Sequence, residues 1–120
     1  MTDYDYIYII PMRGRPKVRP RVASKRAYMP KYYTDWKLAL KSKLIAKRAK
    51  PMKGDVSLDI QFMFKDGRIG DIDNLAGGVM DAANGVLYID DAQVAELRAV
   101  RYKKPAEDQI IIKVKLIGGE

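Results

Sequence analysis

The strongest constraint on the fold is a strict alternation of large apolar residues in the middle of the chain. Residues 56–64, VSLDIQFMF, place an apolar side chain at every second position and lead into a turn with Asp66 and Gly67. A period of two over nine residues predicts a β-strand with one face in the core and one wetter face. The fold is therefore expected to contain a sheet.

Four other segments have strand-like patterns. Tyr4–Ile10 alternates and stops at Pro11, and we expect both faces to be buried toward its end. Val86–Ile89 is a brief apolar run that predicts a short strand. Val94–Tyr102 and Ile110–Leu116 alternate clearly and predict two more.

Two segments have helical spacing. In the first, Thr34 is expected to be the N-cap, while Trp36, Leu40 and Leu44 recur every four residues and Ile45 widens the apolar stripe. The second begins at the acids near residue 73 and ends at Asn84-Gly85. Its apolar residues recur at helical spacing: Leu75, Val79 and Ala82 or Ala83. The sequence therefore predicts an α+β fold with a mixed sheet of about five strands and two main helices.

Composition limits the class of protein. The chain has 120 residues, enough for a single domain (1–120), and 23 Lys and Arg against 15 Asp and Glu, a net charge of +8. Such a surplus favours a polyanionic partner, with nucleic acid first and an anionic membrane second. The absence of Cys and His excludes thiolate zinc fingers and histidine-based catalysis. We see no signal peptide and no membrane span, and we expect a cytoplasmic protein.

The cations are concentrated in one part of the chain. Residues 12–53 hold fifteen cations and one acid, whereas the rest holds eight cations and fourteen acids. Within this part, residues 12–33 contain three prolines and no apolar period, which predicts an irregular basic arm that contributes little to the core. Cations alternating with Gly, Pro and Val can lie along phosphates, so we expect the arm to bind DNA through Arg13, Arg15, Lys17, Arg19, Arg21, Lys25 and Arg26. The later lysines, Lys37–Lys50, fit an ordinary solvated helix face.

Four aspartates within twenty-one residues are the candidate chemical groups: Asp71, Asp73, Asp90 and Asp91. If the two pairs converge, three or four carboxylates share a centre, and their mutual repulsion would be relieved by a divalent cation. Mg²⁺ prefers oxygen ligands and often bridges carboxylates to phosphate, which indicates phosphodiester hydrolysis. The alternatives are that Asp73 is only an N-cap and that Asp90-Asp91 is an ordinary turn. Asn74 and Asp81, seven residues apart on one helix face, are expected to support the site.

These motifs resemble the RusA-type Holliday-junction resolvases. GDIDNL, followed by MDAANGVLYIDDAQV, is similar to that family's D-x-D-N-L, D-A-L and D-D-x-Q segments in order and separation, and GRPKVRPR and YMPKYYTDW resemble its arm. The resemblance implies a Mg²⁺-dependent endonuclease with a RusA-like fold, for which Mn²⁺ can substitute. It implies a homodimer that cuts four-way DNA junctions symmetrically in recombination and repair, of bacterial, phage or prophage origin. Asp71, Asp73 and Asp91 would be the catalytic metal ligands, with Asp90 as an auxiliary ligand.

One position departs from the family pattern. The family motif continues D-x-D-N-L-x-K, and Gly77 stands here at the Lys position. Either another cation reaches the site, for which Lys17, Lys65, Arg68 and Lys104 are candidates, or metal activation of water suffices at a reduced rate. A non-catalytic junction-binding relative is the alternative function. A basic protein that binds an acidic protein or membrane surface is a third, weaker hypothesis.

Overall fold

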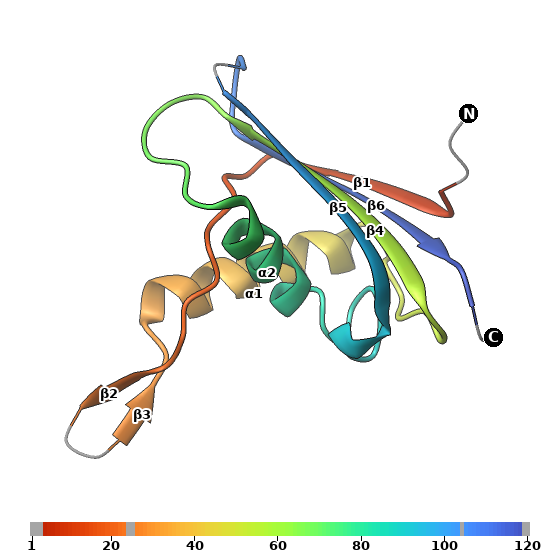
Figure 1. Ribbon diagram of the computed structural model, residues 1–120, viewed down its shortest axis with the longest axis horizontal. Coiled ribbons are helices and arrows are strands. Elements are labelled where there is room, and N and C mark those ends of the chain that lie inside the picture. The colour runs from red at the N-terminus through yellow and green to blue at the C-terminus, as the bar shows by residue number, and fades with distance from the viewer. Residues whose placement is uncertain (1–3, 24–25, 104, 119–120) are drawn as a thin grey trace.

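The computed structural model describes residues 4–23, 26–103 and 105–118. In these ranges a four-stranded sheet carries two helices on one face, and a two-stranded hairpin projects away from the sheet (Figure 1). Along the chain the elements are β1 (Tyr6–Ile10), β2 (Arg21–Ala23), β3 (Arg26–Tyr28), α1 (Lys31–Ala46), β4 (Val56–Phe64), α2 (Ile72–Ala82), the 3₁₀ turn η1 (Asp91–Gln93), β5 (Val94–Lys103) and β6 (Gln109–Leu116).

The sheet is mixed, in the order β1-β6-β4-β5. β6 pairs antiparallel with both β1 and β4, whereas β4 and β5 are parallel, with Val56 opposite Val94 and Phe64 opposite Lys103. A parallel pair requires a crossover between the end of one strand and the start of the next, and α2 supplies it. The segment from β4 through α2 to β5 therefore carries all four candidate aspartates.

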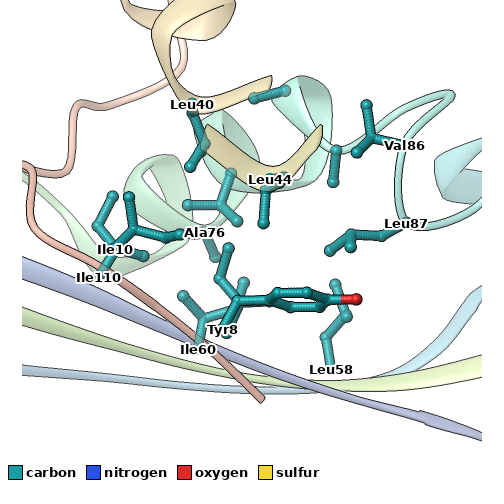
Figure 2. Packing of buried hydrophobic residues seen from close by; sticks show 14 of the residues in the cluster. Tyr8, Ile10, Leu40, Leu44, Leu58, Ile60, Ala76, Val86, Leu87 and Ile110 are labelled. Atoms are coloured by element: carbon teal, nitrogen blue, oxygen red, sulfur yellow. The ribbon is translucent and has the colours of Figure 1, made fainter. Parts of the chain in front are cut away.

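The core lies between the sheet and the two helices (Figure 2). From the sheet, alternate residues of the central strands point inward, such as Leu58 and Ile60 of β4 and Ile110 of β6. Leu40 and Leu44 of α1 meet them from the other side, and all five side chains are almost fully buried. The alternation in the sequence thus determines which face of β4 the helices cover.

Several sequence predictions are confirmed. The α+β class, the mixed sheet and the two main helices are as expected, and the predicted strand at 56–64 has the predicted bounds. The two later strands also form, with β5 and β6 each differing from prediction by one residue at one end.

Other details are wrong. The segment Val86–Ile89 forms a turn in which Tyr88 makes only isolated bridges, because this short run is used to reverse the chain between α2 and β5. β1 is buried on one face only, since Ile9 is 51% exposed. α1 begins at Lys31 after Pro30, so Thr34 lies inside the helix, and Ile45 is exposed.

The basic arm is more ordered than its composition predicts. Its residues include the hairpin of β2 and β3 and the first turn of α1, where Tyr33 is fully buried in the core. The segment before the hairpin is held by two contacts. The carbonyl oxygen of Arg13 accepts a hydrogen bond of 2.8 Å from Trp36 Nε1, and Gly14 is buried against the ring of Phe62. The arm is therefore packed on the domain at its base.

Candidate functional site

Two of the four candidate acids lie at the N-terminal end of α2. Asp71 is the N-cap, with extended backbone and no capping hydrogen bond from its side chain. Asp73 lies in the first turn, where its Oδ1 accepts a 2.9 Å hydrogen bond from the backbone N–H of Asn74. The alternative in which Asp73 is the N-cap is therefore wrong. Both carboxylates are exposed, and the positive end of the helix dipole favours their negative charge.

Asp71 also lines a cleft that contains three cations. The cleft has a volume of about 540 Å³ and lies between the loop after β4 and the end of β5. Its lining includes Lys65, Arg101 and Lys103, and the guanidinium of Arg101 donates a hydrogen bond to the carbonyl oxygen of Gly70. The carboxylates of Asp66 and Asp71 thus share one open cleft with three cationic side chains. Such a mixture suits a phosphate that is bound together with a metal cation.

The other two acids lie in the turn before β5. Asp90 is the N-cap of η1, and its Oδ2 accepts a 2.9 Å hydrogen bond from the N–H of Ala92. Gln93 completes this capping box and donates to the carbonyl oxygens of Met52 and Gly54, both at 2.8 Å. The alternative of a structural turn is therefore supported for Asp90. Asp91 follows it and is half-buried.

Buried Tyr88 links this turn to the end of α2. Its hydroxyl donates a 2.8 Å hydrogen bond to the carbonyl oxygen of Met80. Burial raises the pKa of Tyr88 above its usual range, and the negative charges of Asp91, Asp81 and Asp90 raise it further. Asp90 and Asp91 therefore lie near the C-terminal end of α2, and Tyr88 stays protonated.

The two pairs of acids do not meet within one chain. Among the residues that the structure describes, no group of three or more carboxylates is close enough to hold one metal ion. The topology gives the reason. Asp71 follows the end of β4, whereas Asp91 precedes the start of β5. Because the two strands are parallel, these points lie at opposite ends of the pair. The 11 residues of α2, about 16 Å at 1.5 Å per residue, separate them (Figure 1). The expectation of a common centre in a single chain is therefore not met.

Asp81 joins the two helices. Its Oδ2 accepts hydrogen bonds from the Tyr33 hydroxyl at 2.9 Å and from Lys37 Nζ at 3.1 Å, both on α1. Burial alone would raise the pKa of Asp81, but the hydrogen bonds from Lys37 and Tyr33, together with the charges of Lys37 and Lys17, outweigh burial and lower it. Lys37, predicted as a solvated surface cation, is therefore part of a helix-to-helix contact.

The seven predicted DNA-binding cations have different surroundings. Arg13 is used within the domain, where it donates to Asp108 Oδ1 at 3.1 Å and to the carbonyl oxygen of Arg68 at 2.7 Å. Arg15, Lys17 and Arg19 are exposed along the arm. Arg21 and Arg26 belong to the β2–β3 hairpin, and Lys25 lies outside the described residues.

The predicted supporting residue Asn74 is held against this arm. The backbone N–H of Lys17 donates a 2.8 Å hydrogen bond to the carbonyl oxygen of Asn74 in the first turn of α2. A second cleft, of about 490 Å³, lies beside this contact and is lined by Lys17, Val18, Arg19, Pro20, Met29, Lys37, Asn74 and Asp81. The acid end of α2 is thus flanked by cations on two sides, the arm and the end of β5.

A sequence profile of the family Endodeoxyribonuclease RusA matches residues 11–115, most of the chain. The chain belongs to the RusA family. A search of curated proteins gave no match. RusA proteins are crossover-junction endodeoxyribonucleases, and membership therefore assigns the chain to nucleases of recombination that act on branched DNA. Within the described residues of this RusA protein, no helix is long and apolar enough to span a membrane.

Sequence reasoning did not identify Arg101 and Lys103 as residues of the cleft around Asp71. Their positions in the chain are thirty or more residues beyond that acid. Only the parallel register, which places Phe62 opposite Arg101 and Phe64 opposite Lys103, brings them to the end of β4. These two residues could have been found only by predicting that β5 pairs in parallel with β4.

Proposed function

We propose that this RusA protein is a Mg²⁺-dependent endonuclease that hydrolyses phosphodiester bonds in four-way DNA junctions. The observation that carries the proposal is the exposed pair Asp71 and Asp73 at the N-terminal end of α2, next to a cleft with Lys65, Arg101 and Lys103. The carboxylates would bind a metal ion that is also bound by a DNA phosphate, and the lysines and arginine would bind phosphate oxygens.

The chemistry of the donors suits Mg²⁺. Asp71 and Asp73 have only oxygen atoms as side-chain ligands, the type that Mg²⁺ prefers. The Asp71 side chain makes no capping hydrogen bond to its own helix. When bound, Mg²⁺ would polarise the phosphate and activate water, and Mn²⁺ would substitute because it accepts the same ligands. The chain itself would orient the phosphate through the cations of the cleft, which also offset the charge of the DNA.

A second copy of the chain would complete the site. Asp91 lies at the far end of α2 from Asp73 and is only half-buried, so its carboxylate is available to another molecule. In a homodimer with twofold symmetry, Asp91 of each copy would reach Asp71 and Asp73 of the other, and Asp90 would hold the turn that presents it. Such a dimer has two equivalent sites, as two symmetric cuts in a junction require.

The basic arm would bind phosphates of the junction. Arg15, Lys17 and Arg19 are exposed and follow each other along one segment, so each can contact a phosphate. The strands β2 and β3 beyond them, to which Arg21 and Arg26 belong, would extend this contact. We infer a cytoplasmic site of action, in a bacterium or a phage-infected cell, from the type of family.

The second candidate function is junction binding without cleavage. The observation that favours it is that α2 itself, Ile72–Ala82, carries no Lys or Arg beside its acids. This function predicts tight binding to junctions that is insensitive to Mg²⁺, and no product with any divalent ion.

Cleavage of a labelled four-way junction tests the proposal. The protein is incubated with the junction or with a linear duplex of the same sequence, in Mg²⁺, Mn²⁺ or EDTA. We expect paired nicks in the junction only, lost with EDTA and reduced by at least about 1,000-fold in Asp73→Asn, whose junction affinity stays within about tenfold. Asp35→Asn is the matched control, since it removes an exposed carboxylate on α1 paired only with Lys31. Absence of product from the unaltered protein under every metal would leave only the binding function.

A further inference from the structure

The acidic part of the chain has no cations of its own. From residue 69 to residue 97 there are six acids and neither Lys nor Arg. On α2, Asp73 and Asp81 are the charged residues. A phosphate held against this helix would therefore be repelled unless cations come from segments distant in the sequence.

Two adjacent glycines of α2 provide the place where such a segment lies. A Cβ atom built on Gly78 would be 2.4 Å from the carbonyl oxygen of Arg15, which is backbone. A Cβ atom built on Gly77 would lie 3.4 Å from both Cβ and Cδ of Lys17. With the Lys17 N–H bonded to the carbonyl oxygen of Asn74, the arm is fastened directly on α2, and the stem of Lys17 covers Gly77.

The position of Gly77 places the stem of Lys17 on the helix face that carries Asp73 and Asp81. Gly77 is four residues after Asp73 and four before Asp81, so these three positions share one face of the helix. Lys17 lies on that face, is exposed, and contributes to the lowered pKa of Asp81. In the described part of the chain, Lys37 is engaged in an ion pair with Asp81, whereas Lys17 makes none.

We propose that Lys17, lying across Gly77, supplies the positive charge that α2 lacks and contacts the phosphate being cut beside Asp73. This inference rests on the proposed nuclease function. The ammonium group would bind a phosphate oxygen and stabilise the negative charge that builds up there during hydrolysis. Lys17 would thereby be a catalytic residue supplied by the arm, and the arm would contribute to cleavage as well as to binding.

Arg101 is the competing source of charge near the acids. Its guanidinium already donates a hydrogen bond to the carbonyl oxygen of Gly70, next to Asp71. This hydrogen bond ties Arg101 to the loop before α2, in the cleft that it shares with Lys65 and Lys103. Lys17 has no comparable side-chain bond among the described residues and lies on the face that Asp73 shares.

Substitution of Lys17 and transfer of its charge to α2 test the inference. Lys17→Met keeps an apolar stem over Gly77 and removes only the charge. We expect single-turnover cleavage of the junction in Mg²⁺ to fall by about 100-fold or more, with junction affinity within about tenfold and an unchanged melting temperature. Lys43→Ala, which removes an exposed cation near the end of α1, is the matched control and should cleave as the unaltered protein does.

The double variant Lys17→Ala/Gly77→Lys carries the lysine on the helix instead of the arm. Gly77 has ordinary helical backbone, and removal of the Lys17 stem frees the space above it. We expect it to cleave within about tenfold of the unaltered protein, whereas Lys17→Ala alone stays about 100-fold or more below it. A structural role of the arm would not produce this rescue.

The outcomes separate the two proposals. Unchanged cleavage by Lys17→Met overturns the role of Lys17 and leaves the nuclease function intact. Loss in Lys17→Met without rescue by the double variant overturns the placement of the charge across Gly77. No cleavage by the unaltered protein overturns the nuclease function, and the role of Lys17 falls with it.

Discussion

At the scale of single residues, Gly77 and Gly78 are neighbours in α2 with different surroundings. Each lowers the stability of the helix by about 1 kcal/mol relative to Ala. A Cβ on Gly78 would overlap the backbone of Arg15 at 2.4 Å, whereas one on Gly77 would meet Lys17 at 3.4 Å, an ordinary contact distance. The sequence alone leaves this double cost unexplained, because the reason is the arm packed against the helix.

This difference makes a matched pair of substitutions informative. We expect Gly78→Ala to be less stable than Gly77→Ala by about 1–3 kcal/mol, because the gain in helix propensity is shared and only Gly78→Ala must displace backbone. Urea unfolding followed by circular dichroism measures both. Equal stability of the two variants would show that the arm does not lie on α2 as described. Gly77→Ala should retain cleavage, since Lys17 can stay in place.

The identities of the candidate acids could be predicted from the sequence, but not their grouping. The spacing of Asp71 and Asp73 and the pair Asp90-Asp91 stand out in a basic chain. That these pairs lie at opposite ends of α2 depends on the parallel pairing of β4 and β5, which no local pattern encodes. For the same reason the sequence could name Lys17 only as one of several cations, and the contact with Gly77 distinguishes it.

At the scale of elements, α1 and α2 are held together by a polar contact centred on Asp81. Tyr33 and Lys37 donate to its carboxylate, and Lys41 Nζ donates to the carbonyl oxygens of Ala82 and Asn84 at 2.7 and 2.6 Å. Lys41 thereby satisfies carbonyl groups at the C-terminal end of α2 that have no partner within the helix. The contact fixes the helix that carries Asp73 relative to the helix that follows the arm.

Asp81→Asn should therefore lower stability in a pH-dependent way. We expect a cost of about 1–2 kcal/mol at pH 7, where the charged carboxylate accepts from Tyr33 and Lys37. Because the pKa of Asp81 is lower in the folded protein than in the unfolded chain, its contribution is complete above the unfolded value, about 3.9. It is lost as the pH falls through the folded value.

Urea unfolding at pH 7 and at pH 3 measures this dependence. The difference between the unaltered protein and Asp81→Asn should shrink at the lower pH. Asp35→Asn, which affects an exposed ion pair with Lys31, should differ little from the unaltered protein at either pH. A difference for Asp81→Asn that stays constant between the two pH values would mean that the carboxylate charge does not stabilise the contact.

Elements with a clear period were predictable, and those without one were not. β4, β6 and the body of α1 place apolar residues in the core at regular intervals, so their patterns are visible in the sequence. β5 has no buried residue, and it was predicted from the alternation of its residues alone. The turn at 86–89 is apolar because Val86, Leu87 and Tyr88 fill the end of the core while the chain reverses, and an apolar run of that length does not distinguish a turn from a strand. The arm lacks a period, yet it is positioned by hydrogen bonds and glycine contacts.

At the scale of the whole molecule, the candidate acids lie in two groups at opposite ends of α2, with Asp71 and Asp73 at one end and Asp91 at the other. In the function proposed above, each group is one half of a site. If two copies exchange these halves, a twofold dimer contains two complete sites. Each site then needs residues from both copies, and a damaged half affects only the site in which it takes part.

This arrangement predicts that two inactive proteins regain activity when mixed. In a heterodimer of Asp73→Asn with Asp91→Asn, one site carries both substitutions and the other carries neither. If the subunits assort at random, half of the dimers are heterodimers with one intact site, which gives about a quarter of the normal number of sites. Such dimers should nick one strand of a junction and should not make paired cuts, because their second site is inactive.

The matched control is a mixture of Asp71→Asn with Asp73→Asn. Both substitutions affect the same half, so every site in that heterodimer has one damaged acid and no activity should return. The proteins are unfolded and refolded together, and the products on a labelled junction are compared with those of each protein alone. Cleavage in the first mixture only would establish a site shared between two copies. No cleavage in either mixture, from proteins that sediment as dimers, would instead mean that Asp91 acts with acids of its own chain after a rearrangement of the turn before β5.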